Sequence, residues 1–502
     1  MKRTLSLLAL LLLLLPAPKA EEGMWIPMLL EQLNLKRMQD LGLELSAEDI
    51  YSVNRSSLKD AIVQFGGGCT AEIVSPEGLL LTNHHCGLGA IQRLSSLEND
   101  YIANGFWAQS YEEELPCAGL TVTMLVRMEE VTDRMMEGIT PEMNQLQRQQ
   151  ALRQNAEKIE QQMTEGTHYE ARVRSFFYGN RYYVFINEVF RDIRLVGAPP
   201  ASIGKFGGDT DNWMWPRHTG DFSIFRIYVG SDNKPASYSK DNVPYKPKTH
   251  LKISLKGYEK GDFTFVFGYP GTTREYLTSY GVDVTVNKEN PLRIDLRSQR
   301  LDIINAAMND SRLVRIQYTS KAAGIANYWK KMIGESRGIR QFDAVKKKEQ
   351  FEQAFRGWAA GNPQREAAYG KLLDQFSSAY QSYLPINLSS IYLSEAGQSI
   401  ELVRFAAGFR SLVQVSKKKD ASREDLSKAL AQVKKAATDF YRNYSPAIDR
   451  RIAASMLREM KKGMDPRWLP DVFTLISTRY GGDCDRYVSD LFENSVFADS
   501  VK

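Results

Sequence analysis

Residues 66–86, GGGCTAEIVSPEGLLLTNHHC, combine two apolar runs, a turn and a terminal pair of histidines. The runs CTAEIVS (69–75) and LLLTN (79–83) flank the turn PEG, a pattern that predicts two antiparallel strands. The second run ends at His84 and His85, two of only five histidines in the chain. A histidine fixed at the end of a strand is a candidate general base, because proton transfer needs an imidazole held within reach of its partner.

Strand patterns continue to about residue 273, and helical patterns follow. Runs rich in β-branched and aromatic residues predict further strands at 120–128, 181–196, 221–230 and 253–271. One helix interrupts them at 140–163, where Thr140 opens the expected capping box. Beyond residue 273 the composition shifts to Ala, Lys, Gln, Glu, Leu and Arg, and Ser422 is the expected N-cap of a helix over 422–444. The chain therefore has the pattern of an α+β protein.

The N-terminus has the pattern of a secretory signal. Lys2 and Arg3 precede an apolar run and Ala20 supplies a small residue for cleavage, so residues 1–20 are the expected signal peptide. The run is shorter than the ~20 residues that span a bilayer, and we expect no membrane span after its removal. Without residues 1–20, 62 basic residues face 60 acidic ones, which argues against nucleic acid as a partner. We expect a periplasmic or secreted protein.

Cys69 and Cys86 stand at the two ends of the predicted strand pair. If they form a disulfide, the bridge pins the strand ends, holds His85 in one orientation and stabilises the fold by ~3 kcal/mol through loop closure. Export permits such a bridge. The sequence leaves the pairing of Cys117 and Cys484 undecided.

Asp221 is the candidate carboxylate partner of His85. It lies in DNWMWPRHTGDFSIFRIYVG (211–230), directly after Gly220 and at the start of an apolar strand. A carboxylate at that position would fix the imidazole tautomer and stabilise the imidazolium. His84 is expected to point the opposite way, because side chains alternate along a strand.

Two long segments, residues 66–86 and NWMWPRHTGDFSIFRIY (212–228), resemble the bacterial exported serine dipeptidyl peptidases, the family that includes dipeptidyl-peptidases 7 and 11. The resemblance extends from GMWIPMLLEQL at 23–33 to GIANYWKK at 324–331. It implies an α+β fold in which a chymotrypsin-like double β-barrel carries a large inserted α-helical domain.

The resemblance also implies domain boundaries and residue roles. Residues 21–273 would form the trypsin-like peptidase domain, with the first barrel and the opening strands of the second, and residues 274–502 the helical domain. The implied activity is removal of dipeptides from oligopeptides with a free N-terminus, with no cofactor and no metal. His85 is similar to the catalytic base and Asp221 to its orienting acid. A homodimer is implied as well.

Three further residues resemble those that hold the substrate's α-amino group: Asn212, Trp213 and Asn327. Their chemistry suits that role, because amide oxygens accept hydrogen bonds from an ammonium group and an indole face attracts a cation. Binding the amine at a fixed depth would make cleavage proceed in units of two residues.

The serine of the triad is not found in this sequence. The family carries it in a turn like GNSGSP within the second barrel, and residues 1–502 contain no such motif. GESRG at 334–338 lies in a helical pattern, without the turn that an oxyanion hole requires. We therefore expect that the second barrel is incomplete, that the serine lies beyond this chain, and that this form is inactive alone. The alternative is a truncated homologue that no longer hydrolyses peptides.

Two other functions are compatible with parts of the pattern. A periplasmic protein that binds peptide N-termini without hydrolysis would keep the amine site and return intact peptide. A zinc site could use His84, His85, Cys86 and Asp221, but neighbouring histidines on a strand point to opposite faces, and no C-x-x-C or H-E-x-x-H spacing is present. We therefore expect no metal.

Overall fold

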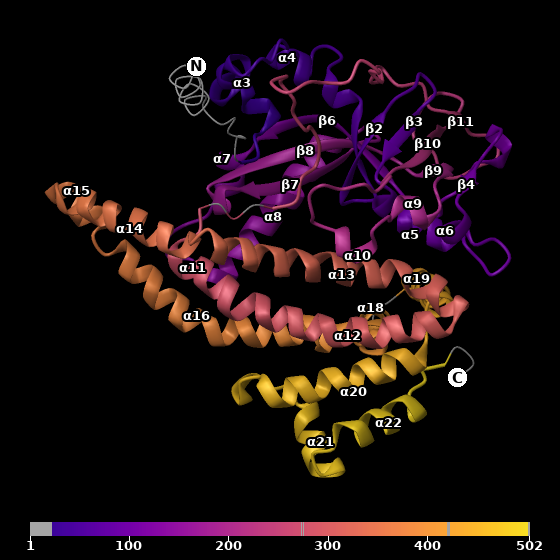
Figure 1. Cartoon of the computed structure of the whole chain (residues 1–502), viewed down its shortest axis with the longest axis vertical. Coiled ribbons are helices and arrows are strands. Elements are labelled where there is room, and N and C mark those ends of the chain that lie inside the picture. The colour runs from indigo at the N-terminus through magenta and orange to yellow at the C-terminus, as the bar shows by residue number, and fades with distance from the viewer. Residues whose placement is uncertain (1–22, 273, 275, 419–421, 500–502) are drawn as a thin grey trace, which may run out of the picture. The chain divides into compact units, whose positions relative to one another are not determined.

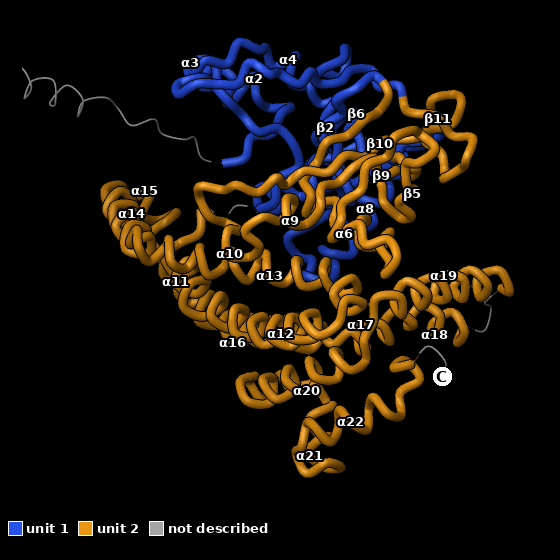
Figure 2. The backbone as a smooth tube through the Cα atoms, turned by 45° about the vertical axis from the view of Figure 1, so that its right-hand side comes forward, with its two compact units in different colours: residues 1–76, 122–189, 246–275 blue, residues 77–121, 190–245, 276–502 orange. Residues whose placement is uncertain are grey.

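The computed structural model describes residues 23–272, 274, 276–418 and 422–499, so the expected signal peptide at 1–20 lies outside the described residues. The chain folds as a mixture of helices and antiparallel strands, as the sequence predicts (Figure 1). It divides into two compact units, coloured separately in Figure 2. The first unit contains residues 1–76, 122–189 and 246–275, and the second contains residues 77–121, 190–245 and 276–502.

The first unit is built on strands in the order β2-β1-β6-β8-β7. Their bounds are β1 (Ile62–Phe65), β2 (Cys69–Ile73), β6 (Val122–Glu130), β7 (Glu170–Phe176) and β8 (Arg181–Phe190). A tight turn joins β1 to β2 and places Phe65 opposite Cys69. Apolar side chains at alternate positions of these strands are buried, among them Val63, Phe65 and Val122, so the period-two pattern of the sequence marks the covered face.

Helix α8 (Gln145–Thr164) packs against the strand pair β7–β8. Ile159 of the helix joins Ala171, Val184 and Ile186 of the strands in one apolar cluster. The helix begins five residues after the predicted start, because Asn144 and Gln147 form the capping box that the sequence interpretation assigned to Thr140. The prediction of a helix at 140–163 is thus confirmed, and its N-cap was wrong.

The prediction of strands at 253–271 was wrong. Within the described residues, 251–271 contains no strand, and the apolar residues Ile253, Leu255 and Val266 are exposed. Two isolated hydrogen bonds hold the segment's ends: Leu251 N–H donates to the Ile73 carbonyl at 2.8 Å and Tyr269 N–H to Thr70 Oγ1 at 2.8 Å. An alternating sequence forms a strand only where a neighbouring strand completes its ladder, and none of the described strands does so here.

In the second unit, short strands support the segment that carries the histidines. Their order is β4-β9-β10-β3, with β11 beside β10 and β5 beside β9. The bounds are β3 (Leu79–Thr82), β4 (Phe106–Trp107), β5 (Leu115–Pro116), β9 (Asp192–Ala198), β10 (Ser223–Val229) and β11 (Val243–Pro244). β10 pairs antiparallel with β3 and places Ser223 opposite Thr82. The residues just after β3 and just before β10 therefore lie at the same edge.

Helices follow from residue 279 to residue 494, and several run as long rods side by side (Figure 1). The longer ones are α12 (Asn290–Asp310), α13 (Arg312–Gln341), α14 (Ala344–Ala360), α16 (Leu372–Glu395), α19 (Arg423–Arg442), α20 (Pro446–Gly463), α21 (Val472–Tyr480) and α22 (Cys484–Asn494). α12, α13, α20 and α22 share one apolar core around Leu296, Tyr318 and Met456. Ser422 caps α19 through a capping box, as predicted. Among the described helices, none has both the length and the apolar character needed to cross a membrane.

Candidate active site

The two histidines occupy the first turn of a helix. Strand β3 ends at Thr82, Asn83 is the N-cap, and α5 (His84–Leu94) begins at His84. Two hydrogen bonds fix this junction to the start of β10: Asn83 Nδ2 donates to the Asp221 carbonyl at 3.1 Å, and Ser223 Oγ donates to the Asn83 carbonyl at 2.9 Å. The junction therefore has a set position before any substrate binds.

His85 is bound to Asp221 through two of its nitrogen atoms. The Nδ1 atom lies 2.8 Å from Asp221 Oδ2, and the backbone N–H donates to Oδ1 at 3.0 Å. The histidine side chain is 62% exposed and the aspartate side chain 15% exposed. The carboxylate thus holds Nδ1 from the covered side, while the ring as a whole remains accessible to solvent.

The environment of Asp221 keeps its carboxylate ionised. Burial works against the charge, but hydrogen bonds from the side chain and backbone of His85, with the nearby Arg217, outweigh it and lower the pKa of Asp221. An ionised partner at Nδ1 favours the imidazole tautomer whose Nε2 is free to accept a proton. The pair therefore combines an ionised carboxylate at Nδ1 with an imidazole ring that solvent can reach.

His84 is buried, and the strand alternation on which its predicted direction rested is not present. It sits on a helix rather than a strand, where successive side chains diverge by about 100°. Its ring forms a hydrogen bond with the Pro199 carbonyl, its Nε2 atom is buried without a partner among the described residues, and burial lowers its pKa. The ring packs on Gly204, at the end of α9 (Ala201–Gly204), so closely that a Cβ there would lie 2.4 Å from His84 Cδ2. His84 therefore packs directly on the end of α9.

The three residues predicted to hold an amine lie together. Asn212 Nδ2 donates to Asn327 Oδ1 at 3.0 Å. Trp213 Nε1 donates to the same oxygen at 2.9 Å and to the Asn327 carbonyl at 3.0 Å. Trp213 has a positive φ of 59° and is 58% exposed, so its indole is held in place by Asn327 while most of its surface faces solvent. Asn327 comes from α13, far along the chain from the other two.

Arg217 is a residue that the sequence interpretation missed. Its Nη1 atom donates to Asn212 Oδ1 at 3.4 Å, its Nη2 atom lies 4.0 Å from Asp221 Oδ2, and its Nε donates to Thr219 Oγ1 at 3.1 Å. It therefore connects the asparagine–tryptophan cluster with the histidine–aspartate pair. The only signal in the sequence was an arginine four residues before Asp221. The loop that brings the guanidinium of Arg217 close to both Asn212 and Asp221 could not be predicted from the sequence.

Cys69 and Cys86 form a disulfide, as expected, and Cys117 and Cys484 are free and buried. Cys86 Sγ lies 3.5 Å from His85 Nε2. A disulfide sulfur is not a thiolate, so Cys86 lacks the form in which cysteine binds zinc. Cys86, which the alternative zinc site would need as a ligand, is therefore bonded to Cys69 instead.

Comparison with known proteins gives a consistent picture. The model of the Peptidase S46 family matches residues 20–502. An Asp/Glu-specific dipeptidyl-peptidase of Flavobacterium psychrophilum is 43% identical over 94% of this chain and 66% of its own length. Dipeptidyl-peptidase 7 of Porphyromonas gingivalis is 41% identical over 96% of this chain and 67% of its own length.

Solved structures of dipeptidyl peptidases are similar to this chain as well. The crystal structure of Porphyromonas endodontalis DPP11 in complex with the dipeptide Arg-Glu superposes with a TM-score of 0.81 at 35% identity, over 96% of this chain and 69% of that one. The chain spans 52% to 66% of the length of the first three curated relatives that it matches. Because the family model covers nearly all of the described chain, the conclusion about its family is direct: this protein belongs to the Peptidase S46 family.

Proposed function

We propose that this chain provides the base, the orienting acid and the amine-binding residues of a serine-type dipeptidyl peptidase. The substrates are oligopeptides with a free N-terminus, and the products are dipeptides. The observation that carries the proposal is the contact of His85 Nδ1 with Asp221 Oδ2, joined through Arg217 to the cluster of Asn212, Trp213 and Asn327.

The proton transfers follow from the geometry of the pair. His85 Nε2 takes the proton of a serine hydroxyl as that oxygen attacks the peptide carbonyl, and later returns it to the leaving amine. Asp221 stays ionised and stabilises the imidazolium. Among the described residues no serine hydroxyl forms a hydrogen bond with His85 Nε2. We therefore assign the serine to residues outside these 502, in keeping with the greater length of the relatives.

The amine-binding residues set the length of the product. Among the described residues, Asn212 Oδ1 receives only a long bond from Arg217, at 3.4 Å, so it is an available acceptor for an incoming ammonium group. The exposed indole of Trp213 adds attraction for a cation. An amine held here, at a fixed distance from His85, selects the second peptide bond for attack.

We assign residues 21–273 to a chymotrypsin-like peptidase domain and residues 274–502 to a helical domain inserted into a double β-barrel. Residues 1–20 act as a signal for export to the periplasm or the medium, and the active protein is a homodimer. The resemblance of the sequence to exported dipeptidyl peptidases supports these assignments.

Binding and release of peptides test the function. A tetrapeptide with a free N-terminus should bind the chain, and the same peptide N-acetylated should bind at least tenfold more weakly. Asn327→Ala should remove that preference, since it deletes the acceptor shared by Asn212 and Trp213, whereas Asn305→Ala on the exposed surface of α12 should keep it. Equal affinity for the free and acetylated peptides would contradict the assigned amine site.

Hydrolysis separates the peptidase from a peptide-binding protein. Mass spectrometry of peptide incubated with the 502-residue chain should show intact peptide. If the reading frame beyond codon 502 encodes a GNSG-like turn, the extended protein should release dipeptides, and His85→Ala should lower kcat by about 10⁴-fold or more. An extended protein that binds but never cleaves would favour the non-hydrolytic binding function.

A further inference from the structure

A cavity of about 380 Å³ in the second unit is lined by twelve residues, of which four are cationic and one is acidic. It lies among α12, α13, α17 (Glu401–Ala407) and α20, away from His85 and Asp221. Arg297, Arg300, Lys321 and Arg404 line it, and Glu401 is the only acidic residue in the lining. The volume falls in the range of small-molecule sites, which is roughly 300–1,000 Å³.

The carboxylates nearby do not balance these cations. Glu395 is shared by three arginines, with Arg293 Nη1 at 2.9 Å, Arg297 Nη2 at 2.8 Å and Arg300 Nη1 at 3.5 Å. Glu401 pairs with Lys321 Nζ at 2.5 Å. Asp449 is a third nearby carboxylate, whose charge acts on Lys321. Three carboxylates therefore face five cations, and two positive charges in and around the cavity have no counter-charge of their own.

Two buried hydrogen-bond donors without partners are a second, independent sign that the cavity can hold an anion. The Nε atoms of Arg297 and Arg300 are buried and have no partner among the described residues. The side chains of these arginines are only 17% and 13% exposed. A buried guanidinium N–H left unpaired costs free energy, so a ligand that accepts from both Nε atoms would gain more here than at the surface.

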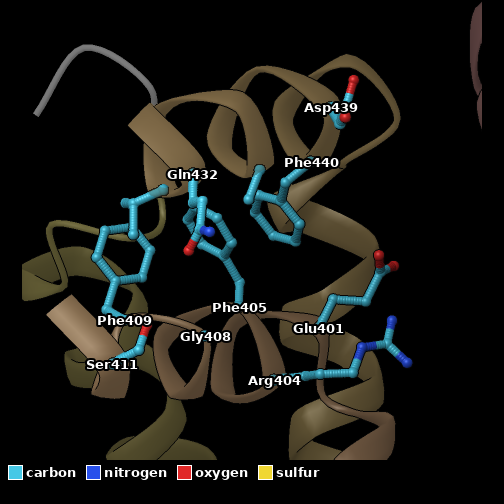
Figure 3. Close-up of a pocket in the computed structure, with 11 residues that line it drawn as sticks. Glu401, Arg404, Phe405, Gly408, Phe409, Ser411, Gln432, Asp439 and Phe440 are labelled. Atoms are coloured by element: carbon cyan, nitrogen blue, oxygen red, sulfur yellow. The ribbon is translucent and has the colours of Figure 1, made fainter. Parts of the chain in front are cut away.

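Arg404 supplies a further donor at the mouth of the cavity. It is exposed, and its guanidinium forms no hydrogen bond or ion pair within the described part of the chain. Figure 3, which shows a neighbouring pocket, places Glu401 and Arg404 with their charged ends on the same side, away from the rings of Phe405 and Phe440. The positive charge of Arg404 also acts on Arg300, whose pKa falls to about 10, mainly through burial.

We propose that this cavity binds a small divalent oxyanion, such as inorganic phosphate or the dianion of a small dicarboxylic acid. Arg297 and Arg300 donate hydrogen bonds to the anion from inside the cavity, and the exposed Arg404 donates from its opening. The hydroxyls of Ser320 and Ser399, which also line the cavity, are available to the remaining oxygens. None of the three amine-binding residues lines the cavity, although Asn327 precedes the lining residue Tyr328 on α13.

Calorimetric titration of the whole chain with inorganic phosphate tests the proposal, with succinate as the dicarboxylate arm and chloride at equal ionic strength as the monovalent control. Phosphate or succinate should bind with a stoichiometry of one and at least tenfold more tightly than chloride. The arm that binds more tightly identifies the chemical source of the anion. Chloride binding as tightly as both divalent ions would overturn the proposal.

Variants locate the site. Arg404→Gln should weaken divalent-anion binding about tenfold, and Arg451→Gln, an exposed arginine on α20, should leave it unchanged. Arg300→Gln should abolish binding. If that variant fails to fold, Arg404→Gln still decides the question, because its side chain makes no bond within the described structure whose loss would unfold the protein. Equal affinities for Arg404→Gln and Arg451→Gln would show that the anion binds elsewhere and would overturn the assignment.

Discussion

The two carboxylate oxygens of Asp221 are divided between two nitrogen atoms of one residue, His85. Oδ1 accepts from the backbone N–H and Oδ2 contacts the ring at Nδ1, so the aspartate fixes both the start of α5 and the orientation of the imidazole. A contact between the carboxylate and Nδ1 alone would fix only the orientation of the ring. The double contact means that any change at Asp221 disturbs the position of His85 as well as its tautomer.

This arrangement predicts a stability difference that depends on pH. The folded state lowers the pKa of Asp221 below its ordinary value of 3.8, so the stabilisation is present above that value and disappears as the pH falls through the folded pKa. At pH 6, Asp221→Asn should lower the free energy of unfolding by about 1–3 kcal/mol, because a buried hydrogen-bonded charge is lost. Urea denaturation of both proteins from pH 6 to pH 3 should show the difference shrinking below pH 4. A difference that stays constant over this range would contradict the assigned contact.

Asp449 should behave in the opposite sense. It accepts the N–H groups of Glu401 at 2.7 Å and Leu402 at 2.8 Å, at the start of α17, but burial raises its pKa from 3.8 to about 6. A raised pKa contributes stability that is full below pH 3.8 and is lost as the pH rises through 6. Relative to Asp449→Asn, the wild-type protein should therefore lose stability between pH 4 and pH 6. The same denaturation series measures it, and a wild-type gain over that interval would refute the assignment.

The sequence predicted the pairing of His85 with Asp221 because each residue flanks a strand whose apolar pattern is strong. β3 and β10 are adjacent and antiparallel, with Thr82 opposite Ser223, so the end of one and the start of the other meet at one edge. The apolar pattern of each strand is local, so it can be recognised in the sequence of that strand alone. The neighbouring helix start at His84 was missed, because the run LLLTN gives no sign that the chain turns into a helix immediately after Asn83.

Features that depend on distant partners could not be predicted in this way. Residues 253–271 alternate as a strand would, yet no described strand completes their ladder. The contact of Arg217 with both Asn212 and Asp221 depends on the path of a compact loop. The anion cavity depends on four helices that are separated by up to about 150 residues, and no single segment carries its pattern.

Gly204 should not tolerate a side chain. A Cβ at this position would lie 2.4 Å from Cδ2 of His84, and the ring is buried and cannot move away without losing its bond to Pro199. Gly204→Ala should therefore destabilise the protein by about 1–3 kcal/mol, as overpacking does in a closed core. Gly334→Ala is the matched control, since Gly334 lies within α13 with no atom within 4 Å of the added carbon. The control should gain about 0.5–1 kcal/mol. Equal effects of the two substitutions on Tm would show that His84 does not press on Gly204.

The disulfide between Cys69 and Cys86 should account for any effect of a reducing agent on stability. Closing a loop of this length is worth ~3 kcal/mol in the chain-entropy model, so reduction should lower Tm by several degrees. The double variant Cys69→Ala/Cys86→Ala should start at the lower Tm and show no further change on reduction, because Cys117 and Cys484 are already free. Those two thiols should also resist alkylation in the native state, since both are buried and burial raises the pKa of Cys117 to about 12. A further drop in the Tm of the double variant on reduction would mean that another bridge contributes to stability.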